Sequence, residues 1–209
     1  MPSVWKSTLE SIRISTASER PLATSGAVSI IVAVYGCSLA LMALRLTLKG
    51  KVDRKTRLEI ADLIRLIEEQ SDLLRQLADR DIKAFQTFLA AVASKRRNTA
   101  KPRSAATTMN ASVLEVTRIP LLSAAETEKI FPLLVKAVPL CRENLRCDLA
   151  AAANNCACAI SNLVLNIAEN ANQLEPAMRA KLNRTGQKLV VAAVRAAKDI
   201  NRMISSPED

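Results

Sequence analysis

The longest regular pattern in the chain lies between residues 53 and 94, a segment with neither Gly nor Pro. Its apolar residues recur mostly at steps of three and four, the spacing that places side chains on one face of an α-helix. We therefore predict one long helix here, or two nearly collinear ones. The opposite face is rich in Asp, Glu and Arg, and we interpret that face as exposed to solvent.

A second segment is apolar all round. Nineteen uncharged residues run from Gly26 to Leu44, and basic residues follow from Arg45 onward. A stretch of this length can span a bilayer, with its basic flank on the cytoplasmic side. Small residues such as Gly36 equally suit a helix that packs against protein on every side. The local pattern leaves both interpretations open, and Gly50 marks the expected end of the helix in either case.

The rest of the chain is helical by pattern as well. Further helices are predicted over residues 3–16, from 106 through an interruption or kink at Pro120, over 123–145, over 147–171, and from Pro176 to about 204. Residues 94–106 carry basic side chains around a proline, which predicts a mobile basic loop. No segment alternates long enough to form a strand. We therefore expect an all-α fold, an up-and-down bundle of about six or seven helices in one domain spanning residues 1–209.

Composition excludes several kinds of chemistry. The chain contains no His, which excludes Ser-His-Asp triads, Cys-His dyads and His-ligated metal sites. Its 5 cysteines lack the CxxC spacing, so we interpret them as reduced thiols of a cytoplasmic protein and expect no metal site. The net charge of +10 would attract nucleic acid, but one Trp, one Tyr and three Phe offer few surfaces for base stacking. Nucleic acid is therefore not an expected partner.

Several weak motifs occur in a familiar order. Residues 42–51 (MALRLTLKGK) follow the small-residue helix, and residues 77–85 read LADRDIKAF. Residues 116–121 read VTRIPL, residues 147–152 read CDLAAA, and residues 166–170 read NIAEN. In this order the motifs resemble those of the cyclodeaminase/cyclohydrolase family, which includes the C-terminal domain of formiminotransferase-cyclodeaminase and bacterial methenyltetrahydrofolate cyclohydrolases. The resemblance covers about residues 5–204. It implies a soluble helical bundle that forms a homodimer, in which the apolar helix is the buried centre rather than a membrane span.

The resemblance also implies an activity. Members of this family close or hydrolyse a folate-linked C–N bond through a tetrahedral carbon between two nitrogens, which requires an acid for the leaving nitrogen. Asp148 matches the family's Asp at a helix start and is the candidate acid/base, with a role as helix cap as the alternative. Asp79 and Asp81 match family positions too, but we interpret them as part of the solvated helix face.

The remaining candidates would bind substrate. They are Gly26, Arg45, Thr47, Lys51, Asn166 and Asn170. The two asparagines are one turn apart and would pair with the edge of a pterin ring, although core amides bonded to other helices fit the sequence equally well. Lys51 would meet the substrate's carboxylates, with a solvated charge as the alternative. No cofactor is expected, and a tetrahydrofolate derivative would be the substrate.

Five positions depart from the family pattern. Thr24 and Ser25 replace two of three glycines in the turn before the apolar helix, which changes a turn that relies on glycine conformations. Arg45 stands where the family has Asn, Ala150 where it has Gly, and Ala168 where it often has a basic residue. These changes indicate either a different small imine or amidine substrate or a catalytically inactive relative that binds a ligand or a partner protein.

Overall fold

The computed structural model describes residues 3–19, 21–96 and 102–205, in which helices are joined by short non-helical segments. The helices are α1 (Leu9–Thr16), α2 (Ser25–Leu48), α3 (Arg54–Arg96), α4 (Pro102–Glu128), α5 (Ile130–Ala137), α6 (Arg146–Ala171) and α7 (Pro176–Ser205). Short 3₁₀ turns η1 (Val4–Lys6), η2 (Val138–Leu140) and η3 (Glu143–Leu145) join or precede them. No strand occurs in these ranges, so the predicted all-α bundle is confirmed.

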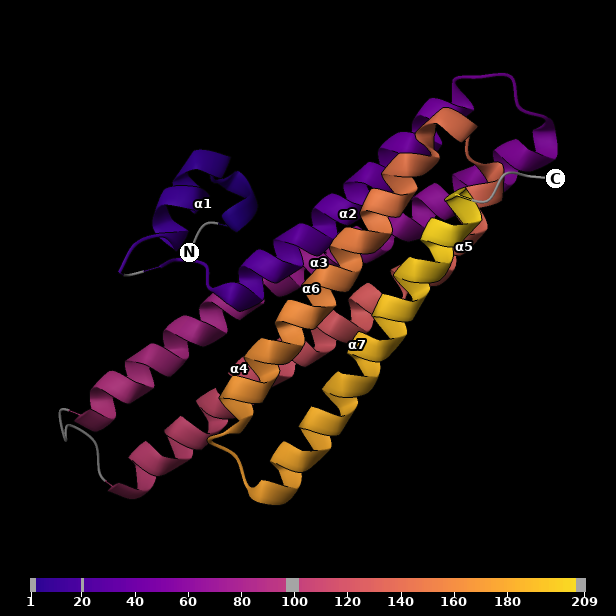
Figure 1. Ribbon diagram of the computed structural model, residues 1–209. Helices are drawn as coiled ribbons and strands as arrows, with labels where there is room; N and C mark the ends of the chain where they lie inside the picture. The colour runs from indigo at the N-terminus through magenta and orange to yellow at the C-terminus, as the bar shows by residue number, and fades with distance from the viewer. Residues whose placement is uncertain (1–2, 20, 97–101, 206–209) are drawn as a thin grey trace.

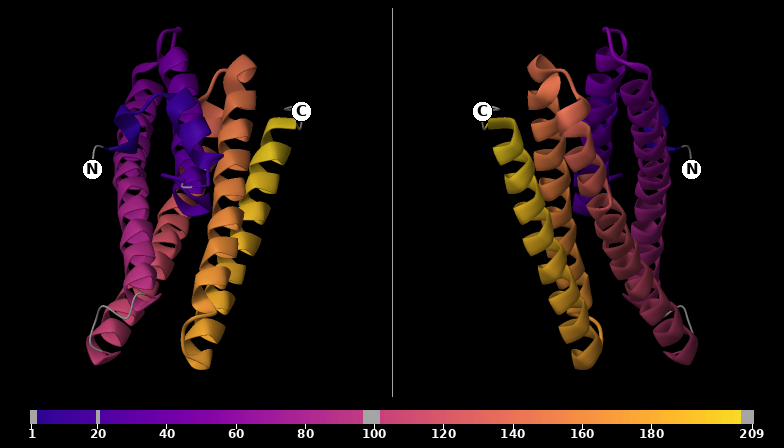
Figure 2. Two further views of the ribbon diagram at one scale, coloured as in Figure 1. Left: turned by 90° about the vertical axis from the view of Figure 1, so that its left-hand side faces the viewer. Right: turned by 90° about the vertical axis from the view of Figure 1, so that its right-hand side faces the viewer.

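The long helices run up and down along one common direction, with α1 set to one side beside the start of α2 (Figure 1). Helix α2 is in contact with both α3 and α6 and occupies the centre of the upper half. The α3–α4 and α6–α7 hairpins continue past the start of α2 and diverge from each other at their far ends (Figure 2). In the first turn of α2, Gly26 and Ala27 are buried between the two hairpins, whereas Ser25 is exposed.

Burial of α2 depends on small side chains. A Cβ atom on Gly36 would lie 3.0 Å from the backbone oxygen of Ala152 and 3.2 Å from the Sγ of Cys156, so a larger residue would push α6 away. By length and composition, α2 and the segment Glu143–Ala171 could each cross a membrane, yet 67% of the most apolar window of α2 is buried inside the bundle. This burial is what the core-helix interpretation of the apolar segment expects.

Several expectations about helix boundaries were wrong. The segment after residue 94 continues as helix up to Arg96, and α4 begins at Pro102, a residue whose missing N–H costs nothing in a first turn. The expected mobile loop near residues 94–106 otherwise falls on residues 97–101, which lie outside the described ranges. Helix α4 also continues through Pro120 to Glu128 without an interruption, and the expected helix over 123–145 is instead divided among the end of α4, α5, η2 and η3.

A side chain from α6 explains how α4 tolerates Pro120. Proline has no N–H, so the carbonyl of Val116, four residues earlier, loses its helical hydrogen-bond donor. The side-chain amide of Asn170 on α6 donates a hydrogen bond to this carbonyl at 2.7 Å. A tertiary contact thus replaces the missing local bond, and it also ties α4 to α6.

We predict that Asn170→Val destabilises the protein by about 2 kcal/mol, because the Val116 carbonyl is left unpaired. In a Pro120→Ala background the restored backbone N–H supplies the missing donor, so the same Asn170→Val change should cost about 1 kcal/mol less. Urea denaturation of the four proteins of this double-mutant cycle measures the coupling. Equal costs in both backgrounds would contradict the proposed replacement of the donor.

Candidate functional site

The start of α2 is capped by a residue from another helix. Thr24 occupies the N-cap position but makes no side-chain capping bond. Instead the carboxylate of Asp81 on α3 accepts the backbone N–H of Ala27, and the Asp81 side chain is buried, with only 5% of the residue exposed. A Cβ on Gly26 would lie 2.6 Å from the Oδ2 of Asp81, so only glycine at this position permits so close an approach.

The interpretation of Asp79 and Asp81 as solvated residues is therefore wrong for Asp81. Asp79 is half-buried and accepts the backbone N–H of Val4 at 2.8 Å, which ties the N-terminal segment to α3. A signal for Asp81 was present in the pattern. Buried Leu74, Leu77 and Ala78 are followed by Asp81 at the next three- or four-residue step, so the acid continues the apolar face.

Burial sets the chemistry of this acid. Removal from water disfavours the ionised form and raises the pKa of the Asp81 carboxyl to about 6, while the Ala27 N–H opposes the rise. A carboxyl that titrates near neutral pH can both donate and accept a proton under physiological conditions.

Two amides from α6 lie beside the same helix start. The side-chain N–H of Asn166 donates to the Oγ of Ser25 at 2.9 Å, and the side-chain N–H of Asn170 donates to the Oδ1 of Asn166 at 2.9 Å. We call Ser25, Gly26, Asp81, Asn166 and Asn170 the helix-start cluster. Three of the predicted site residues, Gly26, Asn166 and Asn170, are thus brought together. Both asparagines are bonded to neighbouring helices, as the core-amide alternative expects.

The other four predicted residues lie at the opposite end of α2. Thr47 is 21 residues after Gly26, a separation of about 30 Å along the helix axis. The Thr47 hydroxyl is buried, donates to the carbonyl of Ala43 at 2.9 Å and accepts the backbone N–H of Arg142 at 3.2 Å. These bonds fasten the end of α2 to the segment before α6, so Thr47 has a structural role.

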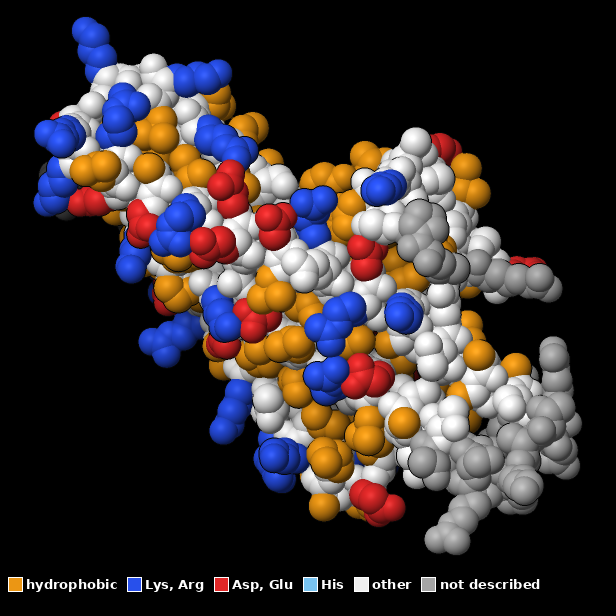
Figure 3. All heavy atoms as spheres, turned by 180° about the vertical axis from the view of Figure 1, so that it is seen from behind, with side chains coloured by type: hydrophobic (Ala, Val, Ile, Leu, Met, Phe, Trp, Pro, Cys, Tyr) orange, Lys and Arg blue, Asp and Glu red, His pale blue; other side chains and the backbone are white. Residues whose placement is uncertain are grey.

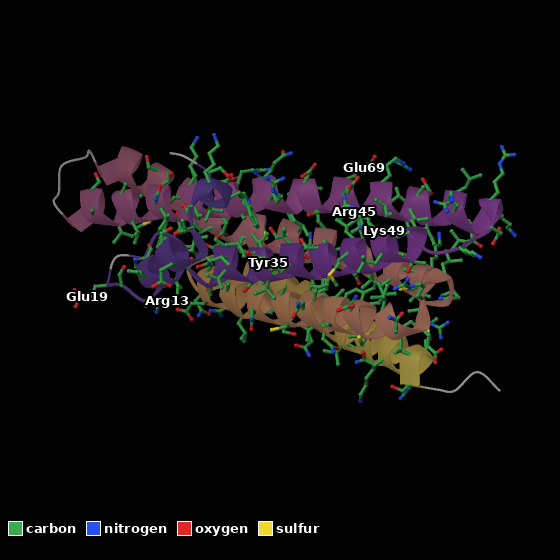
Figure 4. All side chains as sticks on the ribbon, turned by 90° about the horizontal axis from the view of Figure 1, so that it is seen from above. Arg13, Glu19, Tyr35, Arg45, Lys49 and Glu69 are labelled. Carbon is green, nitrogen blue, oxygen red and sulfur yellow. The ribbon has the colours of Figure 1, made fainter. Side chains whose placement is uncertain are left out.

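Arg45, Lys51 and Asp148 are near this same end. Arg45 is ion-paired with Glu68 of α3, and Figure 4 shows Arg45 and Lys49 at the end of α2 that lies away from Arg13 of α1. Lys51 is exposed. Asp148 is half-buried in the first turn of α6, where Leu145 is the N-cap residue, so Asp148 itself is not the cap. A single chain does not bring these residues to the helix-start cluster.

Two surface hollows flank the cluster. One, the α2–α6 hollow, has a volume of about 390 Å³ and is lined by Ser25, Val28, Asn162, Leu165, Asn166 and Glu169, among others. The second, the α3–α4 hollow, has a volume of about 600 Å³ and lies one turn beyond Asp81 along α3. Lys and Arg side chains stand between apolar patches on the side of the molecule shown in Figure 3. Among the described residues, no group of three or more Cys, Asp or Glu is placed to hold a metal ion.

We predict a pH-dependent stability difference between the wild type and Asp81→Asn. The pKa of Asp81 is raised from 3.8 to about 6 in the folded state, so wild-type stability is lost as the pH rises through this range. Between pH 4 and pH 7.5, Asp81→Asn should gain up to about 3 kcal/mol relative to wild type. Urea denaturation at several pH values measures the difference. The exposed Asp72→Asn is the control, and a pH-independent difference for Asp81→Asn would contradict the prediction.

Comparison with known proteins gives the family. No match was found among curated protein sequences. The crystal structure of formiminotetrahydrofolate cyclodeaminase from Thermotoga maritima superimposes with a TM-score of 0.82 at 19% identity, covering 96% of this chain and 97% of that chain, which shows a shared fold. The sequence profile described as formiminotransferase-cyclodeaminase matches residues 8–188. This chain therefore belongs to the formiminotransferase-cyclodeaminase family.

Proposed function

We propose that the protein is an enzyme that acts on a folate or another small imine or amidine by cyclisation, deamination or hydrolysis. The observation that carries the proposal is the buried carboxyl of Asp81 at the start of α2, with a pKa of about 6 and two amides close by. Family membership supports the reaction class, and the cluster supplies a group suited to it.

The reaction passes through a carbon bonded to two nitrogens, and its collapse requires a proton on the nitrogen that leaves. Protonated Asp81 would give this proton, and the resulting carboxylate would be stabilised by the N–H of Ala27 at the positive end of α2. In the preceding step, which forms this carbon, the same group would act as the carboxylate and take that proton from the attacking water or amine. Asn166, bonded to Ser25 at the start of α2, would help to hold this helix end in place beside Asp81.

The catalytically inactive relative is the second candidate. The comparisons do not favour it, but the Ser25 hydroxyl already accepts the Asn166 amide and the Asn170 amide already donates to the Val116 carbonyl. An amide committed to the protein must release its partner before it can bind a substrate. Turnover separates the two candidates, because an inactive relative would bind a ligand without converting it.

We further propose that the protein works as a cytoplasmic homodimer, on the strength of the family resemblance and of 5 free cysteines. Light scattering on the purified protein should give twice the chain mass of 22.7 kDa. A mass of one chain at all concentrations would exclude the homodimer.

We predict that Asp81→Asn lowers kcat for methenyltetrahydrofolate hydrolysis or formiminotetrahydrofolate cyclisation by about 100-fold or more, the usual contribution of a general acid/base. Asp72→Asn, on the exposed face of the same helix, should retain activity within about twofold of the wild type because it lies on solvent. Circular dichroism checks that both variants remain helical.

Asp148→Asn tests the alternative acid at the other end of the bundle. If Asp148→Asn abolishes turnover and Asp81→Asn does not, the acid/base group is Asp148 and the site lies at the start of α6. Wild-type protein that binds a folate but turns over neither substrate would instead favour the inactive relative.

A further inference from the structure

The α3–α4 hollow has the size and lining of a small-molecule site. Its volume of about 600 Å³ falls within the usual range for ligand pockets. The lining residues used below are Arg80, Lys83, Ala84, Ala111, Glu115 and Ile119. Ala84 and Ile119 are buried and form an apolar floor, whereas Arg80 and Lys83 are exposed. An apolar floor with charged groups above it suits a flat ring that carries a charged tail.

The charge around this hollow is positive. Glu115 is the single acid among its described lining residues, and its carboxylate accepts two hydrogen bonds from the Arg118 guanidinium at 2.8 and 3.1 Å. This ion pair compensates the charge of Glu115, and it is the largest cause of a lowered Glu115 pKa. Arg80 and Lys83 therefore dominate the local field.

The same two cations border a second hollow. A space of about 480 Å³ between the N-terminal segment and α3 is lined by Ser3, Val4, Leu22 and Asp79, together with Arg80 and Lys83. Asp79 is the acid in this lining, and it is engaged by the Val4 N–H. Arg80 and Lys83 thus stand on a ridge between two hollows, so a tail that leaves the α3–α4 hollow would pass these cations.

The floor of the α3–α4 hollow backs onto the helix-start cluster. Ala84 is one turn after Asp81 on α3. Along α4, Glu115 precedes and Ile119 follows Val116, the residue whose carbonyl accepts the Asn170 amide. A ring seated on this floor would lie about one helical turn from Asp81 along α3.

We infer that the α3–α4 hollow binds the ring of a carboxylate-bearing heteroaromatic substrate, and that Arg80 and Lys83 bind its carboxylates. The inference rests on the proposed function for the class of substrate. It assigns the substrate tail to Arg80 and Lys83, rather than to Lys51 at the far end of α2. The α2–α6 hollow is a poorer choice for an anion, since its charged lining residue is Glu169.

The first experiment compares two ligands by calorimetric titration. Folic acid carries a pterin ring and a glutamate with two carboxylates, whereas pterin has the ring alone. Replacing both cations in Arg80→Gln/Lys83→Gln should raise the Kd for folic acid about tenfold and change the Kd for pterin much less. The matched control is Arg54→Gln/Lys55→Gln, which removes two charges at the opposite end of α3.

A second pair of variants tests the floor. Ala111 is exposed and lines the hollow, so Ala111→Trp should fill it and abolish binding of both folic acid and pterin. Leu114→Trp places the same ring on the exposed surface of α4 outside this lining, and its affinities should match the wild type. Circular dichroism and urea denaturation show that each variant is folded before it is titrated.

Each result points to a definite conclusion. A Kd for folic acid that rises equally in the control double variant would overturn the inference, because the effect would then be a general one of net charge. Unchanged affinity in both Arg80→Gln/Lys83→Gln and Ala111→Trp would also overturn it and leave the proposed function standing, with the ligand bound elsewhere. A wild type that binds neither ligand and turns over neither folate substrate would overturn the proposed function and the inference together.

Discussion

The burial of a helix N-terminus governs the arrangement of this bundle. The first backbone N–H groups of any helix lack partners within the helix, and water normally satisfies them at the surface. Helix α2 begins instead between the two hairpins, where Thr24 makes no side-chain capping bond. The carboxylate of Asp81 on α3 accepts one of these N–H groups, that of Ala27, and the absence of a side chain on Gly26 leaves the space for it. The contact joins α3 to the start of α2, and Asp79 of the same helix holds the N-terminal segment through the Val4 N–H.

The helices could largely be predicted from the sequence because the patterns that define them are local. The apolar run that predicted α2 starts at Gly26, one residue after the helix does, the expected stop at Gly50 lies two residues after its last residue, and Pro176 does begin α7. The interruption expected at Pro120 does not occur, because the contact that prevents it is not local. The donor that allows α4 to continue is Asn170, which comes from another helix, and no local pattern reveals it.

The candidate site was harder to predict, because the order of motifs along a chain does not give their proximity in a bundle. Gly26 and Thr47 belong to one helix and still lie at its opposite ends. Asn166 reaches Ser25 because α6 runs antiparallel to α2, which also carries Asp148 to the other end. Asp81 was assigned to solvent because its segment contains many charges. Its position in the apolar register, and not its residue type, distinguishes it from its neighbours.

The Asn170 amide donates to the Val116 carbonyl in place of the N–H that Pro120 lacks, so the residues at positions 120 and 170 depend on each other. A proline at 120 requires a donor at 170, and a relative that replaces the proline frees the amide for other partners. The two positions should therefore change together among relatives, although 50 residues separate them in the chain. An amide released in this way is free to bind a substrate, so the identity of residue 120 also influences what the site can recognise.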